Sequence, residues 1–271
     1  DLLDQSDTRR GKPAIHKRFE SLHQASRFAG SSERFGVAGS VLVGDMMLSW
    51  SSELFGDALL HSPGEVIEAA CRTEFSKMRF EVMAGQYLDV LEENAAPIRS
   101  KSEAVARANK VMLYKTAKYS LEAPLLIGAA LGGAHHSELK SLSNFGIPLG
   151  LAFQLRDDIL GVFGDPEVTG KPAGDDLREG KRTVLVAMAQ ESMSTADIKE
   201  FESQFGKSDL DAKGIATLRQ IITDSGAPEH VETLITNLTN TATQALETTT
   251  ITAEARQVLN ELAIIATKRN L

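Results

Sequence analysis

Two neighbouring aspartates, Asp157 and Asp158, interrupt a segment that otherwise has the composition of a buried helix. Apolar residues flank the pair, at positions 149, 151, 153 and 155 before it and at 159, 160, 162 and 163 after it. An unpaired carboxylate in an apolar interior costs several kcal/mol. An adjacent pair of aspartates usually belongs to a solvated helix face, here with Arg156 as a neighbour. The apolar flanks leave little room for such a face, so we interpret the pair as functional.

A second acidic cluster opens the chain. Asp1 and Asp4 are three residues apart and would share one face of a helix. Two carboxylate clusters that faced one cavity would repel each other unless cations lay between them. Oxygen ligands without histidine or cysteine favour Mg²⁺, which commonly bridges a few carboxylates to substrate phosphates.

Basic residues alternate with the acidic ones along the chain. They are Arg9, Arg10, Lys115 in Y-K-T-A-K-Y, and Lys171 and Lys181 on either side of a further acidic pair, Asp175 and Asp176. Any one of them alone would be interpreted as a solvated surface charge. A diphosphate requires positive charge, and arginine matches phosphate oxygens with two donors. The alternation therefore predicts a site for a phosphate–metal assembly.

Helical periodicity dominates the elements that must position these residues. We expect helices over residues 13–27, 34–55, 62–93, 102–119 and 136–163, with Ser102 as an N-cap and the helix over 34–55 buried on all sides. Residues 164–174 predict a loop, and the last third predicts further helices with breaks near Gly206, Gly214 and Gly226. No sustained strand alternation is present. The sequence predicts one all-α domain, a bundle of roughly ten helices.

Composition narrows the function classes. The 271 residues carry a formal net charge of −8, which disfavours nucleic acid and anionic membrane as partners. The one cysteine, Cys71, excludes an internal disulfide, fits a reducing cytoplasm and is expected to be a small buried apolar residue. The longest weakly polar run, residues 123–134, is too short to span a bilayer. We expect a cytoplasmic protein without a transmembrane segment.

Four segments in order resemble the motifs of the trans-isoprenyl diphosphate synthases, also called polyprenyl synthetases. D-L-L-D-Q-S-D-T-R-R-G-K-P resembles the first aspartate-rich motif, and F-Q-L-R-D-D-I-L-G-V-F-G-D with the following T-G-K-P-A-G-D-D-L-R-E-G-K-R-T resembles the second with its lysine loop. G-Q-Y-L-D and Y-K-T-A-K-Y match the two motifs between them. The matches span residues 1–183. From this resemblance we expect residues 1–271 to be a single polyprenyl synthetase domain that lacks its N-terminal helices.

The resemblance implies the isoprenoid synthase fold, a large helical bundle around a central active-site cavity. It implies a Mg²⁺-dependent prenyltransferase that condenses an allylic diphosphate with isopentenyl diphosphate, head to tail, with three Mg²⁺ ions around the leaving diphosphate. We expect geranylgeranyl diphosphate as the product, with farnesyl or longer products as alternatives, and a homodimer. One departure is Gly161, which stands where the family has a third aspartate, four residues after Asp157.

The resemblance also implies a role for each matching residue. Asp1, Asp4 and Asp157 would bind metal, with Asp158 and Asp175 assisting through water, and Arg9, Lys115 and Lys171 would bind the allylic diphosphate. Arg10 would bind isopentenyl diphosphate, and the carbonyls of Lys115 and Thr116 with the side chain of Gln154 would face the developing cation. Gln86 and Asp89 would orient Lys115 and metal-bound water, and Lys181 would close the lysine loop. Met46, Met47 and Trp50 would form the floor of a product tunnel, although periodicity alone favours ordinary core positions for them.

Two rival functions remain. A class I terpene cyclase shares the metal-triggered ionisation, but it would lack the double arginine and the lysine loop. A non-catalytic partner subunit of a prenyl synthase gains slight support from Gly161, whereas the retained Arg9, Lys115, Asp157 and Lys171 argue against it.

Overall fold

A computed structural model describes residues 2–3, 6–9, 11–62, 64–95, 98–165 and 174–268. Helices make up most of these residues, as the sequence predicts. In these residues the strands are two residues long: β1 (Thr8–Arg9) pairs antiparallel with β2 (Lys12–Pro13). Contacts between residues divide the chain into two units, residues 1–63 and 64–271. The single-domain assignment therefore stays a prediction.

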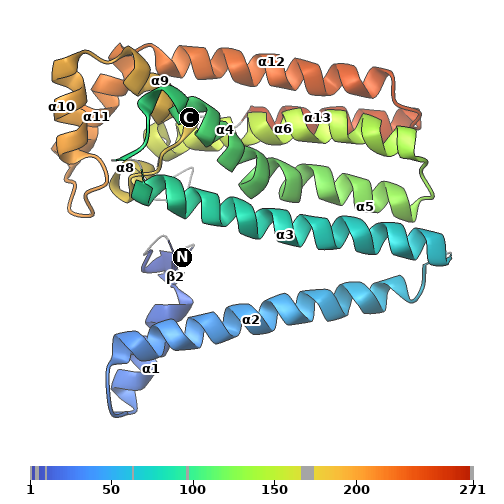
Figure 1. Ribbon diagram of the computed structural model, residues 1–271, viewed down its shortest axis with the longest axis horizontal. Coiled ribbons are helices and arrows are strands. Elements are labelled where there is room, and N and C mark those ends of the chain that lie inside the picture. Colours follow the sequence, from blue (N-terminus) through green and yellow to red (C-terminus); the bar gives the residue numbers. More distant parts are fainter. Residues whose placement is uncertain are drawn as a thin grey trace. The chain divides into compact units, whose positions relative to one another are not determined.

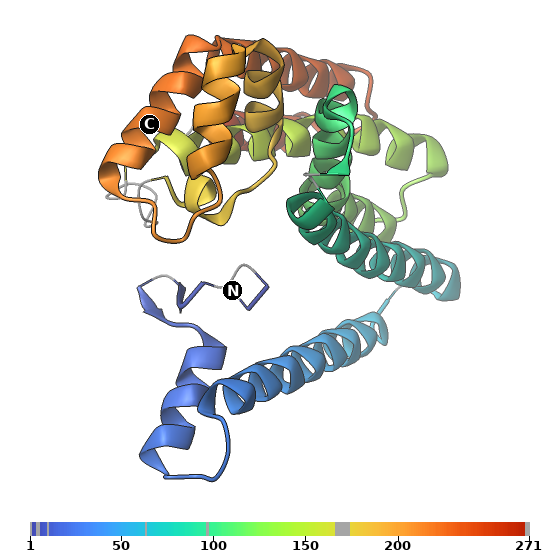
Figure 2. The same cartoon turned by 60° about the vertical axis from the view of Figure 1, so that its left-hand side comes forward.

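The first unit is a helix pair. α1 (Ile15–Ala25) lies against the N-terminal part of α2 (Ser32–Leu59) (Figure 2). The side chain of Ser31 caps α2 by accepting a hydrogen bond from the backbone N–H of Arg34 at 3.2 Å. Aromatic rings fill the contact, with Phe35 next to Phe19 and Phe28 at centroid distances of 6.2 and 5.8 Å.

The prediction that the second helix is buried on all sides is wrong for this structure. α2 buries only Gly36 and Leu59 among its described residues. α1 has 11 residues against 28 in α2, so it can cover only one end of the longer helix. Met46, Met47 and Trp50 are each at least half exposed. Their role as a tunnel floor stays a prediction.

The second unit holds the remaining helices. They are α3 (Glu65–Ala95), η2 (Lys101–Glu103), α4 (Ala104–Met112), η3 (Leu113–Glu122), α5 (Ala123–Leu131), α6 (His136–Phe163), α8 (Asp175–Glu179), α9 (Val184–Ser192), α10 (Thr195–Gln204), α11 (Ala212–Asp224), α12 (Ala227–Glu247) and α13 (Ala253–Thr267). Figure 1 shows α6 beside α12, with α5 lying between α6 and α3. α6 contacts η3, α12 and α13, so it is the central element of this unit.

α6 begins and ends where the sequence predicts. Its start is defined by a capping box, in which the backbone N–H of His135 donates to the carboxylate of Glu138 at 2.6 Å. Buried residues occur on every side of the helix, as expected for a core helix. Its C-terminal half packs with α9, α10 and α11, and its N-terminal half packs with α12 and α13. The Asp157–Asp158 pair therefore lies on the helix with the most extensive core contacts.

Local details depart from the sequence expectations. Ser102 is not an N-cap, because it lies inside the 3₁₀ turn η2, and α4 begins after Glu103 without a side-chain cap. The segment then winds as a π-helix, η3, over ten residues. Gly206 and Gly226 mark breaks, as predicted. Gly214 instead lies inside α11, because its N–H donates to the capping side chain of Asp211 at 2.7 Å.

Two simpler expectations concern burial and membranes. Cys71 is a fully buried free cysteine, as predicted. Among the residues that the structure describes, no helix is long and apolar enough to cross a bilayer.

Arg156 ties three helices of the second unit together. Its Nη1 and Nη2 donate to the two carboxylate oxygens of Glu232 on α12, at 2.5 and 2.7 Å, and its Nε donates to the carbonyl of Thr267 on α13 at 2.9 Å. The side chain is only 12% exposed. This arginine is therefore part of the helix packing and not simply a neighbour of Asp157 on a solvated face.

We expect Arg156→Lys to lower the free energy of unfolding by about 1–2 kcal/mol, because lysine cannot form the two-pronged contact. Chemical denaturation followed by circular dichroism measures the change. The control is Arg72→Lys. Arg72 pairs with Glu68, one turn away on α3; this pair is more exposed and contributes about 0.5 kcal/mol at most. Equal midpoints for the two variants would contradict the role assigned to Arg156.

Candidate functional site

Lys115 and Asp89 form an ion pair between η3 and α3. Both side chains are largely buried, with exposed fractions of 29% and 15%. Gly85, one turn before Asp89, makes the pairing possible: a Cβ there would overlap the backbone of Lys115, so only glycine lets the two helices approach this closely. Gln86 follows it on α3 and is half-buried. Two predicted site residues, Lys115 and Asp89, are thus brought together.

A chain of hydrogen bonds continues from the next residue. The hydroxyl of Thr116 donates to Oε1 of Gln154 at 2.6 Å, and Nε2 of Gln154 donates to Oδ1 of Asp158 at 2.8 Å. The carbonyl of Thr116 accepts a hydrogen bond from the Ser120 hydroxyl at 2.6 Å. The π-helical turn places Thr116 opposite α6, and π-helical segments are frequent at functional sites.

Asp158 is a carboxyl group buried inside this network. It is 3% exposed, and its Oδ2 has no hydrogen-bond partner among the residues that the structure describes. Burial raises the pKa of Asp158 to about 8; the charges of Asp176 and Asp157 add to the rise, whereas the hydrogen bond from Gln154 and the charge of Lys181 oppose it. Without a bound cation, Asp158 is therefore largely protonated at neutral pH.

The position of the absent third aspartate is occupied by another carboxylate. A Cβ added to Gly161 would overlap the carboxylate of Asp176, which reaches α6 from α8. Asp176 is 6% exposed and accepts a hydrogen bond from Nζ of Lys181 at 3.2 Å. The same Nζ lies 2.5 Å from the carboxylate of Glu179. Asp176 thus supplies a carboxylate on the face of α6 where the family's i, i+4 aspartate would lie.

Asp176 is the residue that the sequence interpretation missed. The sequence shows Asp175 and Asp176 side by side, and a loop of unknown path precedes them, so it cannot tell which one points at α6. Asp175 is the first residue of α8 and is half-buried. Asp157 is also half-buried, one residue before the buried Asp158.

The remaining predicted site residues are not part of this network. Asp1, Asp4, Arg10 and Lys171 lie outside the described residues. Arg9 lies in β1, in the first unit, with an exposed side chain. Their assigned roles stay predictions.

The donor set around Asp158 fits a hard cation. No three acidic, histidine or cysteine side chains in the described part of the chain are close enough to form a complete metal cage by themselves. Mg²⁺ does not require one, because it usually keeps several waters and takes one or two protein carboxylates together with phosphate oxygens. The unpartnered Oδ2 of Asp158, beside Asp157 and Asp176, is an oxygen donor of this kind.

Comparisons with known proteins agree with the fold and the motifs. The family model "Polyprenyl synthetase" matches residues 1–222. A geranylgeranyl diphosphate synthase of Methanosarcina mazei is 30% identical over 86% of this chain, and a geranylfarnesyl diphosphate synthase of Aeropyrum pernix is 31% identical over 97%. The crystal structure of a Corynebacterium glutamicum geranylgeranyl pyrophosphate synthase, complexed with isoprenyl diphosphate and magnesium, superposes with a TM-score of 0.92, at 41% identity, over 100% of this chain and 74% of its own.

These findings define an all-α protein with the isoprenoid synthase fold, as the sequence predicts. The chain belongs to the polyprenyl synthetase family. It spans 63% of the length of the Methanosarcina relative and 74% of the Aeropyrum relative.

We expect Gly161→Ala to lower the free energy of unfolding by about 1–3 kcal/mol, because the added methyl group displaces the buried carboxylate of Asp176. Gly128→Ala is the matched control, since a Cβ at that helical position meets nothing within 4 Å. There the gain in helix propensity should raise stability by about 0.5–1 kcal/mol. Thermal or chemical unfolding compares them, and a stabilised Gly161→Ala would show that Asp176 does not occupy this space.

We expect Asp158→Asn to stabilise the protein in EDTA by about 2 kcal/mol near pH 8. Between its ordinary pKa of 3.8 and its raised value of about 8, Asp158 is ionised in the unfolded chain but protonated in the folded one. The wild type therefore loses stability as the pH rises through this window, and the asparagine variant does not. Denaturation curves at several pH values test this. A stability difference that stays constant across the window would contradict a raised pKa.

Proposed function

We propose that this chain catalyses the head-to-tail condensation of an allylic prenyl diphosphate with isopentenyl diphosphate. The observation that carries the proposal is the buried carboxyl of Asp158, beside Asp157 and Asp176 in the segment that matches the family's second aspartate-rich motif; one of its oxygens has no partner in the described part of the chain. A buried carboxyl oxygen without a hydrogen-bond partner is costly unless a ligand uses it. The names of the relatives support a trans-prenyltransferase and favour geranylgeranyl diphosphate as the product.

The acidic residues would hold the ion that grips the diphosphate. Asp157 would bind Mg²⁺ directly, and Asp158, Asp175 and Asp176 would hold waters of the ion. Bound Mg²⁺ would supply the positive charge that stabilises the departing diphosphate. A cation near Asp158 also favours its ionised form, so binding of the ion and loss of the Asp158 proton would be coupled. The magnesium in the Corynebacterium structure supports this choice of ion, and a number of three ions stays a prediction.

The basic and polar residues would bind and orient the organic substrates. Lys115 would donate to the allylic diphosphate, and its ion pair with Asp89 would hold the side chain in place. The amide of Gln154, fixed between Thr116 and Asp158, would keep its oxygen dipole oriented toward the developing allylic cation. Lys181 would exchange part of its contact with Asp176 for a phosphate oxygen. Asp1, Asp4, Arg9, Arg10 and Lys171 keep the roles that the motif resemblance implies.

The alternative functions are less well supported. A terpene cyclase is not favoured, because the relatives reported above are prenyl diphosphate synthases. A non-catalytic subunit loses its main argument, because Asp176 already occupies the place of the absent aspartate at Gly161. A homodimer and a cytoplasmic location remain predictions from the family and the composition.

Incubation with Mg²⁺, isopentenyl diphosphate and farnesyl diphosphate tests the proposal. Chromatography of the dephosphorylated products should show a chain extended by one isoprene unit. A cyclic hydrocarbon would support the cyclase instead, and no turnover by the full-length protein would support the subunit.

We expect Asp157→Ala to remove most turnover, by about two orders of magnitude or more, while the far-ultraviolet circular dichroism stays unchanged. Asp176→Asn should lower turnover more than Asp175→Asn, because the carboxylate of Asp176 lies against α6. The two asparagine variants are a matched pair on adjacent residues. Near-normal rates for Asp157→Ala would refute its assignment to metal, and a larger loss for Asp175→Asn would favour Asp175 over Asp176 as the assisting carboxylate.

A further inference from the structure

A cavity of about 420 Å³ lies in the second unit, between the residues that link α3 to α4 and the helices α9 and α10. Its wall is mixed, with basic, acidic and apolar parts. None of the residues assigned above to metal or diphosphate lines it. A second hollow of about 340 Å³ shares Lys101, Ala104, Ala187 and Gln190 with it and extends the same groove.

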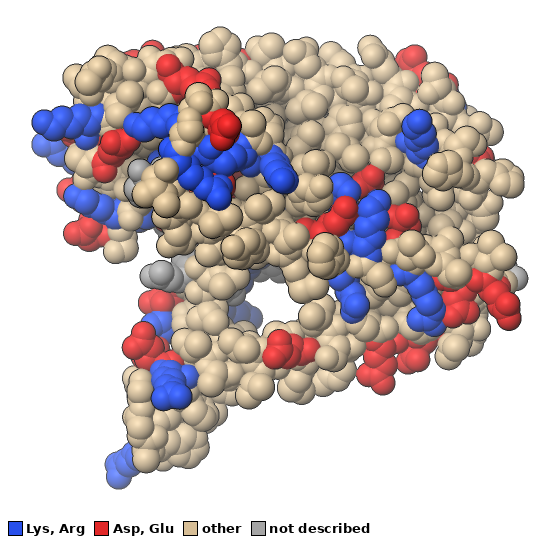
Figure 3. Space-filling model, in the orientation of Figure 1, with Lys and Arg blue, Asp and Glu red and all other residues tan. Residues whose placement is uncertain are grey.

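The charge of this wall is opposite to that of the chain as a whole. The described lining carries four cationic side chains, Arg99, Lys101, Arg107 and Arg182, against two carboxylates, Glu92 and Glu202. The whole chain has a formal net charge of −8. Figure 3 shows Lys and Arg side chains gathered over the face where α4 and α9 lie in Figure 1.

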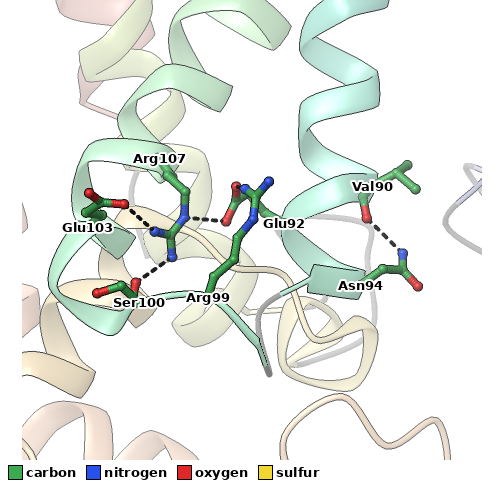
Figure 4. Close-up of polar contacts among 7 residues, drawn as sticks. All are labelled: Val90, Glu92, Asn94, Arg99, Ser100, Glu103 and Arg107. Atoms are coloured by element: carbon green, nitrogen blue, oxygen red, sulfur yellow. Dashed lines mark hydrogen bonds and ion pairs between the residues drawn. The ribbon is translucent and has the colours of Figure 1, made fainter.

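One buried carboxylate forms ion pairs with two of these arginines. Glu92, 6% exposed, accepts from Nε of Arg107 at 2.8 Å with one oxygen, and its other oxygen contacts Arg99 (Figure 4). Arg107 also donates to the carbonyl of Ser100 at 2.9 Å, and its contact with the exposed Glu103 is long, at 3.5 Å. The buried carboxylate thus orients both guanidinium groups but neutralises only one positive charge.

The opposite wall adds a partly buried arginine and an apolar surface. The guanidinium of Arg182 lies 4.8 Å from the centre of the Phe205 ring, and its buried Nε has no hydrogen-bond partner within the described ranges of the chain. Burial lowers the pKa of Arg182, which marks a cation held where water solvates it poorly. Val186 and Ala187 complete the apolar part of the lining. An anionic ligand would satisfy this donor and restore the charge balance.

We propose that this cavity is a second anion site, separate from the catalytic motifs, which binds a small molecule through a diphosphate group. Fixed arginines on two walls match the several oxygens of such a group better than a single charge would. The volume exceeds what one phosphate needs, and the apolar wall offers room for an organic part next to the diphosphate. Arg182 directly follows Lys181, so the occupant would contact the residue next to the lysine that pairs with Asp176.

Calorimetric titration with inorganic diphosphate in EDTA tests the site, because chelation removes metal-dependent binding at the aspartates. The rim variant Arg99→Gln/Lys101→Gln removes the partly exposed charge of Arg99 and the exposed charge of Lys101. It leaves Glu92 paired with Arg107 and releases Glu202 from its ion pair with Lys101. Its control is Lys110→Gln/Lys140→Gln, which removes the same charge from exposed positions outside the cavity. Lys115→Ala tells this binding apart from binding at the proposed catalytic centre. Circular dichroism confirms that each variant is folded.

We expect the rim variant to weaken the binding of inorganic diphosphate at least fivefold, roughly the effect of losing one charge-assisted hydrogen bond. The control variant and Lys115→Ala should bind as the wild type does. If the rim variant does not fold, Arg182→Gln takes its place, with the same expectation. Unchanged affinity in the folded cavity variant, no binding to the wild type, or loss of binding only in Lys115→Ala would overturn the proposal; the last result would leave the proposed function standing.

A parallel titration with farnesyl diphosphate identifies the source of the group. Tighter binding than for inorganic diphosphate, weakened by the same rim variant, supports an organic diphosphate as occupant. Equal or weaker binding, again sensitive to the rim variant, supports free diphosphate. Binding of both compounds that ignores the rim variant counts against the cavity.

Discussion

The second unit depends on holding one carboxyl group, that of Asp158, inside its main apolar helix. A buried carboxyl group without hydrogen-bond partners destabilises the folded state, and the hydrogen bonds of the chain offset this only in part. Gln154 donates to one oxygen, whereas the other has no partner among the described residues. Burial and the nearby carboxylates raise the pKa of Asp158, so either a bound proton or a nearby cation would stabilise this carboxyl group. The proposed function uses a cation for this role.

Two glycines let elements of the second unit approach each other closely. Gly85 lets α3 touch the backbone of η3, so Lys115 and Asp89 meet where water is scarce. Gly161 leaves room on α6 for the carboxylate of Asp176. In both places a missing side chain on one helix makes room for part of another element, the backbone of η3 at Gly85 and a carboxylate at Gly161. A close-packed interior transmits such choices directly, because no void is left to absorb an added methyl group.

Two charged systems of the second unit share α3. Asp89 pairs with Lys115 in the proposed catalytic centre, and Glu92, one turn later, pairs with Arg99 and Arg107 at the second cavity. In the first system a buried carboxylate fixes one lysine. In the second it fixes two arginines and leaves positive charge in excess. The first pair is neutral, whereas the second group carries one positive charge more than its buried carboxylate neutralises, which suits the proposed anion site.

Local sequence patterns suffice to predict much of the helical framework and the burial of Asp158. Apolar residues at helical spacing predict the bounds of α6, because an amphipathic or buried pattern is local information. The apolar flanks also indicate that Asp158 is buried, since they leave the helix no solvated face for it. Ser102, by contrast, is not the cap that its residue type predicts, because it lies inside the 3₁₀ turn η2.

Which carboxylates meet is decided by tertiary packing alone. Adjacent aspartates point in different directions on a helix, and the sequence cannot tell which of Asp175 and Asp176 reaches α6. The overlap of Asp176 with the space above Gly161 depends on the packing of two helices that a loop separates in the chain. The cavity beside Glu92 likewise joins α3 and α4 to α9 and α10, far apart in sequence. Side-chain direction is set locally, but the partner that it meets is set by packing across the fold.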